Sequence, residues 1–257
     1  MATFIHPLAM VSTDASIGDN CVIEAFSIID GDVVIGDDNH IGPGAHIKRY
    51  CRIGHGNTFF NHCCIGHDPQ DVHFDPSART GVIIGSHNVF RELCTVHRAT
   101  RRDNTVIGDH GLFMVNSHIA HDCVVGDHVI MTNNSVLAGF VHIDDCVDLS
   151  AYVAVHQFCS VGRHAMIGAY SKIVQDVIPF ALVDGNPPRV YDANSIGLRR
   201  AAFSSEERRI IRGAIKVIYR ESGTPKRALE TLKARYGDEA LVREIIDFIE
   251  RSTRGII

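Results

Sequence analysis

The sequence has 257 residues, of which 45% are hydrophobic, and it carries 25 Lys and Arg against 30 Asp and Glu. It has no apolar run near the roughly 18–20 residues of a membrane-spanning helix and no secretory signal at its N-terminus, so we expect a cytoplasmic protein without a transmembrane segment. The net charge of −5 and the lack of aromatic residues among the basic ones argue against a nucleic-acid partner.

A hexapeptide repeat runs through the first two thirds of the chain. An apolar residue recurs every six positions from Ile5 to Ile65, from Ile84 to Val96 and from Ile107 to Ile173. A period of six fits a short strand plus a turn, and three such units close one coil of a triangular prism. We therefore predict a mainly β protein in which residues 1–178 form a parallel β-helix. The pattern resembles the hexapeptide-repeat proteins, which implies that the coils are left-handed.

Two slips of this register interrupt the repeat. One falls between Ile65 and Ile84, across residues 67–82, and the other between Val96 and Ile107, across residues 98–106. A solenoid accommodates extra residues only as loops ejected from a corner, and long loops on a rigid scaffold often carry function. We predict an ejected loop at each slip, with a functionally neutral insertion as the alternative.

The chain changes character over residues 179–257. The segment FALVDGNPPRV is predicted to be a Pro/Gly linker. Ser204 and Glu207 then form a capping box in front of an amphipathic helix, a second helix begins at Pro225, and a third spans residues 238–253. We therefore predict a linker and an α-helical C-terminal domain.

A basic stripe is predicted on the first of these helices. Residues 179–257 hold 15 Lys and Arg against 11 Asp and Glu. Arg208, Arg212, Lys216 and Arg220 recur every four residues, which places them on one helix face opposite the apolar face. A solvated charged face is one interpretation, and a docking surface for an acidic carrier protein is the other.

Four of the His in the repeats stand out as candidates, namely His97, His118, His121 and His156. His121 follows the inward Ile119 by two positions, so it should point outwards near a corner, where a neighbouring prism of a trimer would form a cleft. Imidazole is well suited to accept a proton near neutral pH. A polar seam between prisms is one alternative. A zinc site is another, but the spacing of His118 and His121 differs from that of solenoid carbonic anhydrases, so we predict no metal.

Five segments, NSHIAHDCVVGDHV, AVHQFCSVGRHAMIGAYS, TVHRAT, HDPQDVHF and FIERSTRGI, together resemble the acyl-carrier-protein–UDP-N-acetylglucosamine O-acyltransferases of lipid A biosynthesis. The resemblance covers nearly the whole chain. It implies a homotrimer that moves a 3-hydroxyacyl group from the thioester of acyl carrier protein to the 3-position of UDP-N-acetylglucosamine, without a further cofactor. It also implies that His121 is the general base and that the Gly139 N–H stabilises the oxyanion. Asp122 is a candidate to orient His121, although neighbours along a strand point to opposite faces.

The same resemblance implies further roles. Ala169 would set the acyl-chain length by closing the chain groove. The residues that it places at the nucleotide sugar or around the cleft are Asp71, His73, His97, His118, His156, Gln157, Asn194 and Arg200.

Four residues depart from the pattern that the resemblance implies, all on the nucleotide-sugar side. His73 stands in place of Lys, Phe140 in place of His, Ile196 in place of Glu and Ala201 in place of Arg. The base and the hydroxyacyl side match. The departures leave open a paralogue that acylates another UDP-amino sugar, such as a 3-amino analogue. A carbonic-anhydrase-like metal-dependent solenoid is the alternative from another class of protein.

Overall fold

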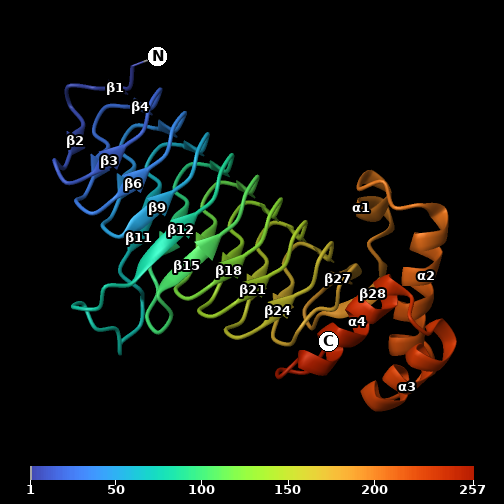
Figure 1. Cartoon of the computed structure of the whole chain (residues 1–257). Coiled ribbons are helices and arrows are strands. Elements are labelled where there is room, and N and C mark those ends of the chain that lie inside the picture. Colours follow the sequence, from blue (N-terminus) through green and yellow to red (C-terminus); the bar gives the residue numbers. More distant parts are fainter. Residues whose placement is uncertain (1) are drawn as a thin grey trace.

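The computed structural model describes residues 2–257 and shows a long triangular prism of short parallel strands with a helical segment at its C-terminal end (Figure 1). Each turn of the chain around the prism contributes one strand to each of three sheets, which we call sheets A, B and C. The predicted left-handed parallel β-helix with an α-helical C-terminal part is confirmed.

Neighbouring strands within a sheet come from successive coils and pair in parallel. Sheet A consists of β1 (Phe4–Ile5), β4 (Val22–Ile23), β7 (His40–Ile41), β10 (Thr58–Phe59), β13 (Val89–Phe90), β16 (Leu112–Phe113), β19 (Ile130–Met131), β22 (Asp148–Leu149), β25 (Met166–Ile167), β27 (Ala181–Asp184) and β28 (Arg189–Ala193). Sheet B consists of β2 (Met10–Val11), β5 (Ile28–Ile29), β8 (His46–Ile47), β11 (Cys64–His67), β14 (Thr95–His97), β17 (His118–Ile119), β20 (Val136–Leu137), β23 (Ala154–Val155) and β26 (Lys172–Ile173). Sheet C consists of β3 (Ser16–Ile17), β6 (Val34–Ile35), β9 (Cys51–Ile53), β12 (Gly81–Ile84), β15 (Asn104–Ile107), β18 (Val124–Val125), β21 (His142–Ile143) and β24 (Ser160–Val161).

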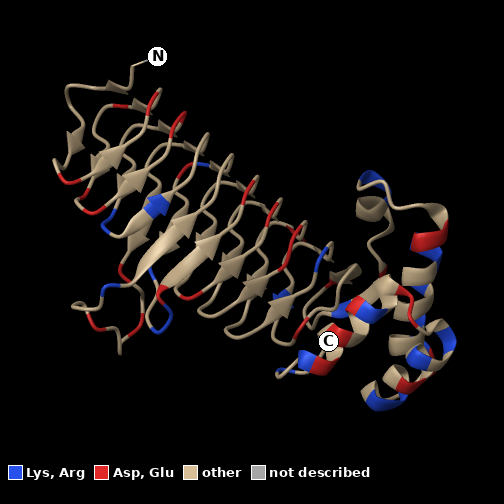
Figure 2. Cartoon of the chain, in the orientation of Figure 1, with Lys and Arg blue, Asp and Glu red and all other residues tan. Residues whose placement is uncertain are grey.

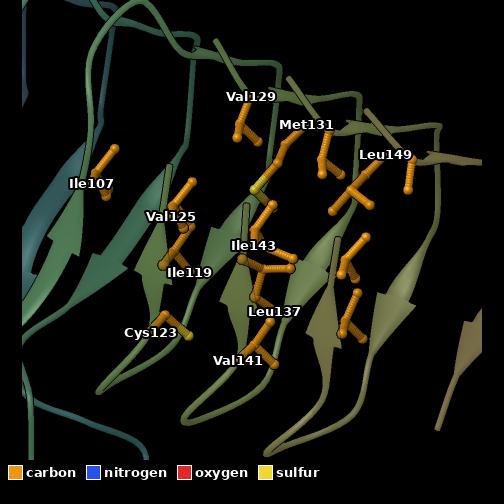
Figure 3. Packing of buried hydrophobic residues seen from close by; sticks show 14 of the residues in the cluster. Ile107, Ile119, Cys123, Val125, Val129, Met131, Leu137, Val141, Ile143 and Leu149 are labelled. Atoms are coloured by element: carbon orange, nitrogen blue, oxygen red, sulfur yellow. The ribbon is translucent and has the colours of Figure 1, made fainter. Parts of the chain in front are cut away.

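The apolar residue of each hexapeptide points into the prism. Phe59, Phe90 and Phe113 of sheet A are buried one above another, with stacked rings whose centroids lie 4.9 and 4.7 Å apart. Figure 3 shows how Ile119, Leu137 and other inward side chains from successive coils pack in the same way. Each coil therefore buries its apolar side against its neighbours, and the opposite face of each strand is left free for polar residues.

A ladder of buried amides runs inside one corner of the prism. The Asn57 side chain donates to Asn39 Oδ1 at 3.0 Å and to the Gly85 carbonyl at 3.0 Å, and it accepts from the Asn88 side chain at 3.0 Å. All three Asn are at most 1% exposed. The ladder satisfies polar groups that the turns of the prism would otherwise bury without a partner.

Two loops leave the prism at the corner between sheets B and C. The first spans residues 68–80, between β11 and β12, and the second spans residues 98–103, between β14 and β15. They fall within the two segments where the repeat slips. The turns that follow β17 and β20 lie at the same corner, because those strands also lead from sheet B to sheet C. The loops are therefore placed beside the turns that carry His121 and Gly139.

The segment predicted to be a Pro/Gly linker is instead a β-hairpin, so that prediction is wrong. β27 pairs in parallel with β25 at the end of sheet A, and β28 pairs antiparallel with β27. Ala181 and Val183 are buried against the end of the prism, whereas the two Pro lie between the strands, where no ladder N–H is needed. The hairpin thus continues the prism beyond residue 178.

The helical segment packs against this end. It consists of α1 (Ser195–Arg200), α2 (Ser205–Lys216), a π-helical turn (Val217–Glu221), α3 (Pro225–Tyr236) and α4 (Ala240–Arg251). The Ser204–Glu207 capping box is present, and Arg163 of the prism pairs with Glu244 of α4 through bonds of 3.0 and 2.8 Å. Within residues 2–257, none of the helices has the length and apolarity to span a membrane. Figure 2 shows that charged residues gather on the turns, loops and helices, whereas most strands carry none.

Candidate active site

A groove with a volume of about 550 Å³ runs along sheet B beside its corner with sheet C. Six of the residues predicted for the site line it, namely His97, His118, His121, Gly139, His156 and Gln157. The other lining residues are Gln70, Ala120, Val136, Leu137, Ala138, Ala154, Val155 and Lys172. The groove therefore brings the four candidate His to one surface.

A second cavity, of about 560 Å³, lies across the same corner on sheet C. Its lining includes Arg102, Phe140 and His142, and the end of α4 closes it through Arg251. His121 does not line this cavity. The groove on sheet B is the candidate active site because both His121 and Gly139 open into it.

His121 and Asp122 form the turn that follows β17. The His121 Nδ1 atom lies 2.7 Å from Asp122 Oδ2. This contact is possible because Asp122 has a positive φ of 62°, which turns its side chain back towards the imidazole. The expectation from strand alternation, that the two side chains point apart, is wrong because neither residue is in a strand. Asp122 is thus placed to hold the Nδ1–H tautomer, which leaves Nε2 free to accept a proton.

The Asp122 carboxylate is completely buried and accepts several hydrogen bonds. The backbone N–H groups of Thr100, Arg101 and Arg102 donate to it at 2.9, 3.0 and 2.6 Å, and the Thr100 hydroxyl donates at 2.6 Å. Burial alone would raise the pKa of Asp122, but the donors from Thr100, Arg102 and His121 outweigh it and lower the pKa below its usual value. Asp122 therefore stays ionised beside His121 near neutral pH.

Gly139 lies in the turn after β20, directly against the His121 ring. A Cβ at this position would stand 2.5 Å from His121 Cε1 and 2.7 Å from His121 Nε2, so a larger residue would collide with the imidazole. Within residues 2–257, the Gly139 N–H donates to no backbone or side-chain acceptor. A free N–H beside the imidazole suits an oxyanion donor.

His97 and His118 form the polar end of the groove. Their rings meet edge to face with centroids 4.7 Å apart, and His118 Nδ1 lies 2.7 Å from the Thr95 hydroxyl. Burial and the neighbouring His118 lower the pKa of His97 to about 4, and burial and His121 lower the pKa of His118. Both rings are therefore neutral at pH 7. His97 Nδ1 is buried without a hydrogen-bond partner among residues 2–257.

The middle of the groove is apolar. Val136 and Ala154 pair in register with His118 on successive strands of sheet B, and Lys172 stands one strand further along. Lys172 and Gln70 line the groove but were not among the residues predicted from the sequence. The hexapeptide register could have found Lys172, because it shares an outward column with His118 at intervals of 18 residues. No comparable signal pointed to Gln70, which comes from the first loop.

Besides Asp122 and the basic stripe on α2, five predicted site residues lie outside this groove. Asp71 and His73 are in the first loop, where Asp71 Oδ1 accepts the His73 N–H at 2.9 Å. Asn194 caps α1 by accepting the Gly197 N–H at 3.0 Å, and its amide donates to a prism carbonyl. Arg200 ends α1, and Ala169 lies in a turn between sheets A and B. Their binding roles stay predictions, and none of the five lines the groove, although Gln70, beside Asp71, does.

The four residues that depart from the expected pattern also lie outside the groove. Phe140 stacks on Phe158 with ring centroids 4.9 Å apart and meets His121 edge to face. His73 is exposed in the first loop. Ile196 is 59% exposed on α1, and Ala201 follows that helix. None of the four replaces a side chain in the wall of the groove.

Some side chains of the basic stripe on α2 already bond to groups of the same chain. The Arg212 guanidinium lies 3.5 Å from the Asp192 carboxylate and donates to Ser195 at 2.7 Å. Arg220 donates to the Tyr191 carbonyl at 2.8 Å. Arg212 and Lys216 are nevertheless 58% and 61% exposed, so both remain accessible to a partner.

Histidine and carboxylate side chains in the groove are not arranged to hold a metal ion. Within residues 2–257, no three His, Cys, Asp or Glu side chains converge as ligands. The His97 and His118 rings meet edge to face, and His121 Nδ1 faces Asp122. The arrangement offers one oriented imidazole, one free N–H and an apolar channel, which suits acyl transfer to a hydroxyl.

Comparison with known proteins places the whole chain in one group. Residues 176–257 match the family described as UDP N-acetylglucosamine O-acyltransferase, domain 2. The acyl-[acyl-carrier-protein]–UDP-N-acetylglucosamine O-acyltransferase of Campylobacter concisus is 36% identical, over 98% of this chain and 96% of its own. The Stutzerimonas stutzeri protein of the same name is 39% identical, over 99% of each chain.

Solved structures show the same likeness. The UDP-N-acetylglucosamine acyltransferase of Francisella novicida superposes with a TM-score of 0.96 at 35% identity, covering 99% of this chain and 94% of its own. The Bacteroides fragilis enzyme also has a TM-score of 0.96, at 38% identity, with 99% and 100% covered. The likeness includes both the prism and the helical segment.

Proposed function

This chain belongs to the acyl-[acyl-carrier-protein]–UDP-N-acetylglucosamine O-acyltransferase family, and we propose that it catalyses the first step of lipid A biosynthesis. In this reaction a 3-hydroxyacyl group moves from the thioester of acyl carrier protein to the 3-hydroxyl of UDP-N-acetylglucosamine. The observation that carries the proposal is the Asp122–His121 pair, which faces Gly139 in the groove.

His121 acts as the general base. Asp122 holds the Nδ1–H, and Nε2 takes the proton of the sugar 3-hydroxyl as that oxygen attacks the thioester carbonyl. The Gly139 N–H donates to the oxyanion of the tetrahedral intermediate. When the intermediate collapses, the C–S bond breaks and the imidazolium returns the proton to the carrier thiolate. No cofactor beyond the thioester enters this sequence.

Two parts of the groove suit the two substrates. His97 and His118 are neutral and polar, which fits hydrogen bonding to the sugar. Val136 and Ala154 form an apolar wall for the hydroxyacyl chain. Asp71, His73, Asn194 and Arg200 would complete the nucleotide site, and Ala169 would limit the chain length, through a neighbouring copy in a homotrimer. The chain would work in the cytoplasm, where acyl carrier protein and UDP-sugars are found.

The direct test supplies the purified protein with 3-hydroxyacyl carrier protein and either UDP-N-acetylglucosamine or its 3-amino analogue. We expect transfer to the hydroxyl acceptor, with a product whose acyl group is released by mild base because it is an ester. A base-stable amide formed only from the amino analogue would assign the other acceptor. Absence of transfer to either sugar would refute the proposed function.

A further inference from the structure

The second loop is held by hydrogen bonds to the Asp122 carboxylate, in the turn that also carries His121. Asp122 accepts three successive backbone N–H groups from Thr100, Arg101 and Arg102, and its own N–H donates to the Thr105 hydroxyl at 2.9 Å. Thr105 lies in β15, directly after the loop. The two ends of the loop therefore close on Asp122, and the position of that carboxylate depends on the loop.

The Thr100 hydroxyl has a particular place in this arrangement. It donates to Asp122 Oδ2 at 2.6 Å, the same oxygen that accepts from His121 Nδ1 at 2.7 Å. The Thr100 Oγ1 atom itself lies 3.4 Å from His121 Nδ1. Asp122 Oδ2 thus accepts from both the Thr100 hydroxyl and the His121 imidazole. The Thr100 hydroxyl fixes the position of this oxygen and takes up part of its negative charge.

The loop does not act by touching the contents of the groove. Thr100 and Arg101 line neither cavity, and Arg102 lines only the cavity on sheet C. The hydroxyl can reach the reaction only through Asp122 and His121. We propose that Thr100 is a positioning residue for the base, which sets the orientation and proton affinity of the His121 imidazole through the Asp122 carboxylate; this rests on the proposed function.

Thr100→Val removes the hydroxyl and keeps the shape of the side chain. We expect kcat to fall about tenfold or more, the effect of about 1.4 kcal/mol at the transition state, with the KM of both substrates within about twofold of wild type. Without the hydroxyl, more negative charge on Asp122 Oδ2 faces the imidazolium. The acidic limb of the kcat/KM profile should therefore move to higher pH.

Two further variants give this experiment its controls. Thr100→Ser restores the hydroxyl and should return kcat to within about threefold of wild type. Thr132→Val removes another partly buried hydroxyl, which donates to the Leu149 carbonyl at 2.7 Å. Thr132 lines neither cavity, so this variant should leave kcat and the pH profile unchanged. If Thr100→Val does not fold, Thr100→Ala removes the same hydroxyl without placing a methyl against the carboxylate.

The proposal also has a readout that does not depend on turnover. An NMR titration of the His121 ring should show a higher midpoint in the Thr100 variant than in wild type. Combining Thr100→Val with His121→Ala should lower the residual rate no further, because Thr100 acts through that imidazole. An active wild type beside a folded Thr100→Val variant with unchanged kcat and pH profile would overturn the proposal. A wild type without acyl transfer would instead refute the function, and the titration would then decide the role of Thr100.

Discussion

At the scale of single residues, the turn conformation of Asp122 is the feature on which the site depends. Its positive φ places the carboxylate beside His121, and the N–H groups of Thr100, Arg101 and Arg102 keep it ionised although it is completely buried. Unpaired, a buried carboxylate would take up a proton and lose its hold on the imidazole. The proposed base is therefore oriented by a group that the loop keeps charged.

Because His97 is buried, we predict that the free energy of unfolding decreases in mild acid. Its pKa is about 4 in the folded chain, against an ordinary value of 6.5, because burial opposes its charged form. The unfolded chain therefore binds a proton first as the pH falls from about 6.5 to 4, which favours unfolding by at most about 3 kcal/mol. The stabilising contribution of neutral His97 is complete above this window and is lost as the pH falls through it.

Urea unfolding at pH 7.5 and pH 5.0, at one protein concentration, measures this effect. The His97→Gln variant should lose less stability between the two pH values than wild type, whereas His128→Gln, which alters an exposed His, should lose as much as wild type. Equal losses in wild type and His97→Gln would show that His97 does not titrate as described.

The residues of the site differ in how well sequence alone predicts them. The hexapeptide register places His118 on an outward face and His121 near a corner, and both line the groove. The contact of His121 with Asp122 could not be predicted, because it depends on a left-handed backbone conformation in a turn and not on strand alternation. Thr100 had no sequence signal, since its position depends on how the loop returns to the prism.

At the scale of the elements, the stacked strands explain why the site is rigid. Neighbouring strands lie about 4.8 Å apart, so β17, β20, β23 and β26 present one outward residue each at a fixed spacing along the groove. The hexapeptide period predicted these strands. It could not predict the β27–β28 hairpin, whose composition is that of a linker and whose strand structure comes from pairing with the exposed edge at the end of sheet A.

The Asn ladder predicts a specific loss of stability. Asn57→Ala removes the donor to the Gly85 carbonyl and the acceptor for Asn88, leaving both groups buried without their partner. We expect the free energy of unfolding to fall by about 2–3 kcal/mol. Asn61→Ala, at an exposed position of the same coil, is the matched control and should change it by less than about 0.5 kcal/mol. Similar unfolding midpoints for the two variants would contradict a structural role for the ladder.

The basic stripe on α2 predicts an effect on the carrier protein alone. Arg212→Gln combined with Lys216→Gln should raise the KM for acyl carrier protein about five- to tenfold, because two exposed cations that attract an acidic partner are lost. The KM for the UDP-sugar and kcat should not change, and the difference from wild type should shrink at high salt.

The control for this variant is Lys226→Gln with Arg227→Gln, which removes two exposed cations from α3. It should leave the KM for the carrier protein within about twofold of wild type. If both double variants raised that KM equally, only the total charge would matter, and a docking role for α2 would be refuted.

At the scale of the whole molecule, the prism separates the functions along its length. The predicted docking stripe lies on the helical segment at the C-terminal end (Figures 1 and 2). The groove lies along sheet B between that end and the two loops. Asp71, Asn194 and Arg200 do not line the groove of His121 in one chain, although Gln70, beside Asp71, does. The proposed trimer would explain why a family resemblance assigns them to the site although the fold of one chain does not.

The central claim is that His121 is the base that drives acyl transfer. It is tested most directly by kcat for transfer from 3-hydroxyacyl carrier protein to UDP-N-acetylglucosamine in His121→Ala, His128→Ala and wild type. His128 is also an imidazole in a prism turn, but it stacks on His110 at another corner, 4.8 Å between centroids. We predict a loss of about 10²–10⁴-fold in His121→Ala and less than about twofold in His128→Ala. A His121→Ala enzyme that is folded and turns over at the wild-type rate would contradict the account.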